Sequence, residues 1–114
     1  MSEVQTGSVR RRRGFLVPPA IPDDVDDPRV EKARGKVRLP HHVQWTTPGH
    51  VYDLQDRRDC LVVYEVVLQQ GLEEDVRYFI EVDKLVDLWD ELYLPVHVRA
   101  AWADWLASRR GVRP

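Results

Sequence analysis

The sequence predicts an all-α fold: a small bundle of three to four short helices, preceded by an extended segment and a disordered N-terminal arm. Two observations lead to this prediction. Five of the eight prolines fall within residues 1–40, which hold no tryptophan or tyrosine and show no helical or strand periodicity. From Tyr52 onward, apolar residues recur at the intervals of an amphipathic helix. A chain of 114 residues is long enough for one such domain.

The disordered arm is predicted to span residues 1–38, and the helical domain residues 39–111. Prolines interleaved with charged blocks, such as the acidic DDVDD, are typical of a segment that buries no core. Within the arm, Asp27 and Pro28 suit the N-cap and first position of a short helix ending near Lys36.

The extended segment is expected within the sequence HHVQWTTPG. Polar His42 and Gln44 alternate with apolar Val43 and Trp45, which predicts a short stretch with one apolar edge. Two interpretations of Trp45 stay open: its indole covers the domain's own core, or it docks on a partner.

The first helix is predicted to follow a cap at Asp53 or Asp56 and to end at Gln70, before Gly71. The β-branched run LVVYEVV also suits a strand, which remains the alternative for this segment. The helical interpretation places these residues on one apolar stripe: Cys60, Leu61, Tyr64, Val67 and Leu68.

Three further segments have helical patterns. In LEEDVRYFI, a short helix would bury Val76, Phe79 and Ile80. In VDKLVDLWDEL, Asp83 is the expected N-cap. The last helix, LPVHVRAAWADWLASRRG, is expected to start at Pro95 and to stop at Gly111. The apolar stripes of the last two helices are Leu85, Leu88, Trp89 and Leu92, then Val98, Ala101, Trp102, Trp105 and Leu106.

No catalytic residue, metal site or cofactor is predicted, and an enzyme with a small-molecule substrate is not expected. His41, His42, His50 and Cys60 follow one another at intervals of 1, 8 and 10 residues, unlike the close ligand pairs of structural zinc sites. Cys60 lies on the apolar stripe and is interpreted as a buried structural thiol.

The number of cysteines and the hydropathy of the chain indicate the cellular compartment. The single cysteine forms no internal disulfide, and no apolar run reaches the length of a transmembrane helix. We therefore expect a cytoplasmic protein with no membrane partner.

Apolar and acidic residues together predict a protein partner. Besides its stripe, the first helix carries Val62, Val63 and Val66, so a second side of the helix must also be covered. Residues 65–91 contain nine acidic and two basic residues, which favours a partner with a basic surface. The predicted partner-binding residues are Trp45, Val62, Val66, Asp87, Asp90 and Glu91.

Three sequence patterns within residues 51–106 carry a family resemblance: YDL, VYE.VL..G...DV and D.L..LWDEL.LP..VR.AW..WL. They resemble a family of small actinobacterial proteins that are partners of AbiE-like nucleotidyltransferase toxins. The shared residues specify helices rather than a site. The resemblance implies an antitoxin or inhibitor that docks on a toxin-like enzyme, and it supplies no catalytic residue.

The alternative function is a DNA-binding regulator. Arg10, Arg11, Arg12 and Arg13, with the basic segment 29–38, would contact phosphates. A disordered solubilising tail has the same composition, and no clear helix-turn-helix accompanies the arginines.

Overall fold

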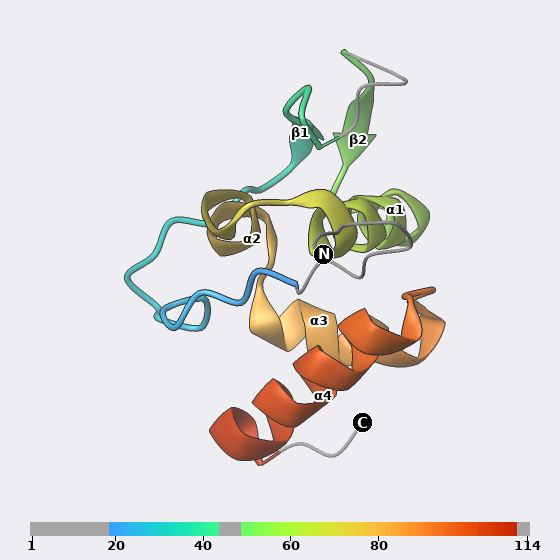
Figure 1. The fold of residues 1–114 in the computed structure, drawn as a ribbon. Coiled ribbons are helices and arrows are strands. Elements are labelled where there is room, and N and C mark those ends of the chain that lie inside the picture. Colours follow the sequence, from blue (N-terminus) through green and yellow to red (C-terminus); the bar gives the residue numbers. More distant parts are fainter. Residues whose placement is uncertain (1–18, 44–48, 112–114) are drawn as a thin grey trace, which may run out of the picture.

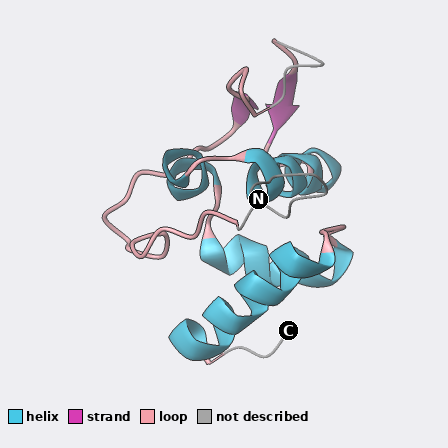
Figure 2. Cartoon of the chain, viewed as in Figure 1, coloured by secondary structure: helices cyan, strands magenta, loops and turns pink. Residues whose placement is uncertain are grey.

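The computed structural model describes residues 19–43 and 49–111 of the chain. Within these residues the fold is mostly helical, as predicted, and it also contains a small two-stranded sheet (Figures 1 and 2). In chain order the elements are β1 (Lys36–Arg38), β2 (Val51–Asp53), α1 (Arg57–Gln70), α2 (Glu73–Phe79), α3 (Val82–Leu88), the 3-10 turn η1 (Trp89–Glu91) and α4 (Val96–Arg110).

The two strands pair in antiparallel register, with Val37 opposite Tyr52. The backbone N–H of Leu54 donates to the Gly35 carbonyl at 2.8 Å, just beyond the paired residues. In Figure 1 the pair of strands lies above α1 and α2. Three residues after β2 the chain enters the first helix, α1.

The strands lie on either side of the predicted extended segment, whose described residues 41–43 are not a strand. Residues 41–43 form a turn closed by a 2.9 Å hydrogen bond from the Val43 N–H to the Pro40 carbonyl. Val43 is buried, so its alternation with polar neighbours reflects a turn over the core rather than a strand edge. The following residues, 44–48, lie outside the described part of the chain.

Helix α1 is a helix and not the alternative strand. Its N-cap is Asp56, whose carboxylate accepts from the backbone N–H groups of Arg58 and Asp59. Gly71 ends it, and a side chain there would put a Cβ atom 2.6 Å from the Val67 carbonyl oxygen. The buried residues of α1 follow helical spacing and are Cys60, Val63, Tyr64, Val67 and Leu68.

Helices α2 and α3 lie where the sequence predicts them, but α3 begins earlier. Its N-cap is Glu81 rather than Asp83. The Glu81 carbonyl accepts from the Leu85 N–H at 2.9 Å, and the Glu81 N–H donates to the Tyr64 hydroxyl at 3.0 Å. The tertiary bond to Tyr64 therefore sets the start of α3, in place of a local side-chain cap.

Helix α4 has the predicted limits, with Pro95 as N-cap and Gly111 as a left-handed C-cap at φ 67°. Its Val98, Trp102 and Leu106 are buried. These residues join one hydrophobic cluster with side chains from α1, α2 and α3. None of the helices in the described ranges is long and apolar enough to cross a membrane.

The predicted disordered arm needs correction for residues 19–38. Val25 is fully buried in the core cluster, and β1 itself falls within this segment. The short helix expected after Pro28 is absent; instead, the Asp27 carboxylate accepts from the Arg29 N–H at 2.8 Å and holds a turn. A single buried residue such as Val25, or a single turn, leaves no periodic pattern in a sequence.

Candidate interaction surface

Helix α1 has apolar residues on a second side, as the sequence predicts. Val62 and Val66 are only half-buried, although both pack against the core cluster. Val62 follows Arg58 by four residues and precedes Gln69 by seven, so it shares a face with these two exposed side chains. This face therefore presents partly uncovered apolar atoms among polar ones.

The most exposed large apolar side chains of the described residues are Tyr93 and Val96, at 82% and 85% exposure. Tyr93 lies in the loop between η1 and α4, and Val96 is the first residue of α4. The neighbouring Leu92 and Leu94 are buried, so the backbone alternates and turns Tyr93 outward. Val96 is turned outward because the buried stripe of α4 begins at Val98.

A hydrogen bond holds this loop beside α1. The Tyr93 N–H donates to Glu65 Oε2 at 2.7 Å. Glu65 follows Val62 by three residues and shares its face of α1, so the hydrogen bond places the Tyr93 backbone beside that face. We call the combined region the α1–loop surface and define it by Val62, Val66, Tyr93 and Val96.

Two of the three predicted partner-binding acids are already engaged within the chain. The Arg57 Nε atom donates to both carboxylate oxygens of Glu91, at 2.9 and 3.2 Å, and Nη1 donates to Asp87 Oδ2 at 3.1 Å. The hydrogen bonds from Arg57 lower the pKa of Glu91 below its ordinary value. Asp90 is exposed and forms no ion pair with the described residues, so it is the acid best placed to meet a partner.

The histidines that raised the question of a metal site are placed apart. His42 Nε2 lies 2.6 Å from Asp75 Oδ2, and the His50 ring packs against Tyr52 with 4.5 Å between centroids. Among residues 19–43 and 49–111, no three His, Cys, Asp or Glu side chains are grouped as metal ligands. Cys60 is buried, as predicted, and burial raises the pKa of its thiol.

Sequence reasoning missed Asp75, the one buried charged residue of the described chain, at 6% exposure. Its carboxylate accepts from the Leu72 N–H at 2.9 Å as well as contacting His42. An acid three residues after a helix N-cap is the signal that would have identified this role.

Sequence reasoning also missed Tyr93 and Val96. The signal is their spacing: Tyr93 alternates with the buried Leu92 and Leu94, and Val96 lies two residues before the buried Val98, on the other side of the helix. The predicted residues Trp45 and Arg10–Arg13 lie outside the described residues, so their placement remains a prediction.

Comparison of the chain with protein-family models, with curated proteins and with solved structures found no match.

Proposed function

We propose that this protein is a protein-binding module whose α1–loop surface docks on a partner with a basic surface. The observation that carries the proposal is the pair Tyr93 and Val96, both more than four-fifths exposed, with the Tyr93 N–H bonded to Glu65 of α1. Exposed apolar side chains gathered in one place are typical of interaction sites, and tyrosine is enriched at interface hot spots.

The chemistry of the partner follows from charge. Residues 41–114 carry eight basic and thirteen acidic residues, and Asp90 and the Arg57-bound Glu91 lie close in sequence to Tyr93. Acidic residues beside a binding surface, here Asp90 and Glu91, increase the rate of association with a basic protein more than they increase the final affinity. A toxin-like enzyme of the nucleotidyltransferase class is the partner that the resemblance of residues 51–106 supports, and the protein would then act as its antitoxin or inhibitor.

The partner is sought by affinity purification of the full chain from its native cells, with identification of the proteins that co-purify. The decisive comparison is Tyr93→Ser against Tyr78→Ser, because both tyrosines are exposed and only Tyr93 belongs to the α1–loop surface. We expect Tyr93→Ser to lose the partner and Tyr78→Ser to keep it. Equal recovery by both variants would refute the proposed surface.

The electrostatic part is tested separately with Asp90→Lys, which leaves the Arg57 ion pairs intact. Against the purified partner, this variant should associate more slowly at low salt, and the difference should shrink as salt screens the charge. An association rate that is unchanged at low salt would remove the requirement for a basic partner.

The alternative, DNA binding through Arg10–Arg13, is supported by that run of arginines alone. A gel shift with the full chain and with the four arginines changed to glutamine tests it. If the arm binds phosphates, the affinity falls steeply with salt and the substituted chain loses both affinity and salt dependence. The protein-binding proposal predicts that the substituted chain still retains its partner.

A further inference from the structure

Lys32 joins the N-terminal segment to the end of α2. Its ammonium donates to three backbone carbonyls, those of Val25, Arg77 and Ile80, each at 2.7 Å. All three of its protons are therefore used. The contact with Arg77 is required by the fold, because the N–H of Glu81, four residues later, donates to Tyr64 instead of to this carbonyl.

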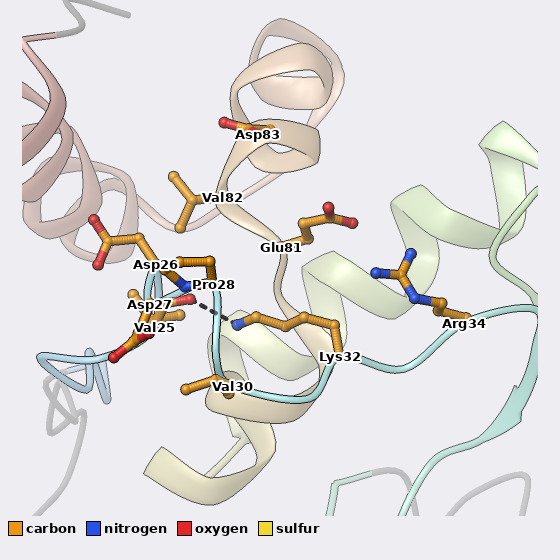
Figure 3. A pocket seen from close by; sticks show the side chains of 10 residues that line it. All are labelled: Val25, Asp26, Asp27, Pro28, Val30, Lys32, Arg34, Glu81, Val82 and Asp83. Carbon is orange, nitrogen blue, oxygen red and sulfur yellow. Dashed lines mark hydrogen bonds between the residues drawn. The ribbon is translucent and has the colours of Figure 1, made fainter.

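The ammonium thus acts as a C-terminal cap for α2. A positive charge at this end of a helix interacts favourably with the helix dipole and with the unpaired last carbonyls. The bond to Val25 also closes residues 25–32 into a loop, visible in Figure 3 as the dashed line from Lys32.

We define residues 22–33 as the strap. It has its own turns, including hydrogen bonds from the Val25 N–H to the Pro22 carbonyl at 3.2 Å and from the Val30 N–H to the Asp27 carbonyl at 3.0 Å. Because these bonds lie within the strap, they do not require contact with the helices. The strap therefore keeps its local shape if it separates from them.

A cavity of about 290 Å³ lies between the strap and the junction of α2 with α3 (Figure 3). The strap side of the cavity includes Val25, Asp26 and Val30, and the other side includes Glu81 and Val82. Side chains of the strap and of the body do not fill this space, so at this point Val25 and the Lys32 hydrogen bonds connect the strap to the helices.

Charge adds to the hold of Lys32. Asp26 belongs to the strap and Glu81 to the body, and both attract the Lys32 ammonium. Asp26 also lies 3.7 Å from the Arg109 guanidinium on α4, and Asp24 accepts a 2.8 Å hydrogen bond from Arg77, so these partly exposed pairs are further links between the strap and the body.

From this geometry we propose that the strap opens and closes as one unit on a helical body that stays folded, and that Lys32 is the latch. In the closed state, the latch caps α2 and holds Val25 in the core. In the open state, Val25 leaves the core and the cavity walls at Glu81 and Val82 become accessible to solvent.

The test is hydrogen–deuterium exchange of the full chain. Deuterium uptake is measured by mass spectrometry in peptides from the strap and in peptides from α1. Lys32→Met removes the charge and the three donors at similar side-chain length. We expect strap amides, including that of Ala33, which donates to the Tyr78 carbonyl at 2.9 Å, to exchange at least about tenfold faster. That ratio corresponds to about 1.4 kcal/mol of opening free energy. The amides of α1 should exchange at their original rate.

The matched control is Lys36→Met, the same change at an exposed lysine of β1, and it should leave strap exchange unaltered.

Two results would overturn the proposal. Wild-type exchange in the strap of Lys32→Met would exclude the latch. Equal acceleration in the strap and α1 would show that the strap is not a separate unit.

Discussion

The contact between Asp75 and His42 yields the sharpest stability prediction. In the wild-type chain the Asp75 carboxylate is 6% exposed, accepts from the Leu72 N–H at 2.9 Å and lies 2.6 Å from His42 Nε2. Asp75→Ala removes this carboxylate from both groups. Losing a bond at a helix N-terminus costs about 0.5–2 kcal/mol, and losing a hydrogen bond to a charged group about 1.5–3 kcal/mol.

Because the two bonds share one carboxylate, their costs overlap, and we expect a loss of about 2–4 kcal/mol in the free energy of unfolding. For a domain of this size, that loss lowers the melting temperature by roughly 10–20 °C. The assay is urea denaturation followed by circular dichroism, on Asp75→Ala, His42→Ala and the double variant. The double-mutant cycle should give a coupling of about 0.5–3 kcal/mol between the two side chains.

Glu74→Ala is the matched control, since Glu74 is the neighbouring acid in the first turn of α2 and is exposed. It should change stability by less than about 0.5 kcal/mol. If Asp75→Ala is as mild as this control, the buried carboxylate does not hold the turn after β1 against α2, and the reasoning fails.

Two further predictions concern the ends and faces of α1. Arg57 lowers the pKa of Glu91 from its ordinary 4.5, so their pair stabilises the fold above that pH and is lost as pH falls through the lower folded value. The stability difference between wild type and Arg57→Met, measured by thermal melts, should therefore be largest near neutral pH and shrink below about pH 4; an equal difference at both ends of this range would contradict it. On the same helix, Leu68→Asp buries a charge at a position 2% exposed and should unfold the protein, whereas Val66→Asp should keep a cooperative melt and lose the partner. A Val66→Asp chain that is unfolded alone would assign that face to the core.

The helix limits were predictable where one residue decides them. Asp56 caps α1 with its own carboxylate, and Gly111 ends α4 in a left-handed conformation that suits glycine. The start of α3 was not predictable, because a hydroxyl from α1 takes up the Glu81 N–H. A bond across 17 residues leaves no trace in local spacing.

The same distinction applies to the candidate surface. The second apolar side of α1 was visible from the positions of Val62 and Val66. The engagement of Glu91 by Arg57 was not, since those residues are 34 positions apart and their pairing depends on how α1 meets η1. The strap was hidden for the same reason: its fixed points lie at Val25 and Lys32, within a proline-rich segment that has no period to detect.

The Lys32 latch has a consequence for synthesis on the ribosome. Lys32 emerges first, and its acceptor Ile80 follows 48 residues later. At the usual elongation rates of about 5–20 residues per second, that interval lasts roughly 2–10 s. During this time the newly made strap has only its internal turns, and Val25 has no core to enter. The strap is thus made first and docked late, which leaves a brief period in which proteases and chaperones meet residues 22–33 as an unprotected segment.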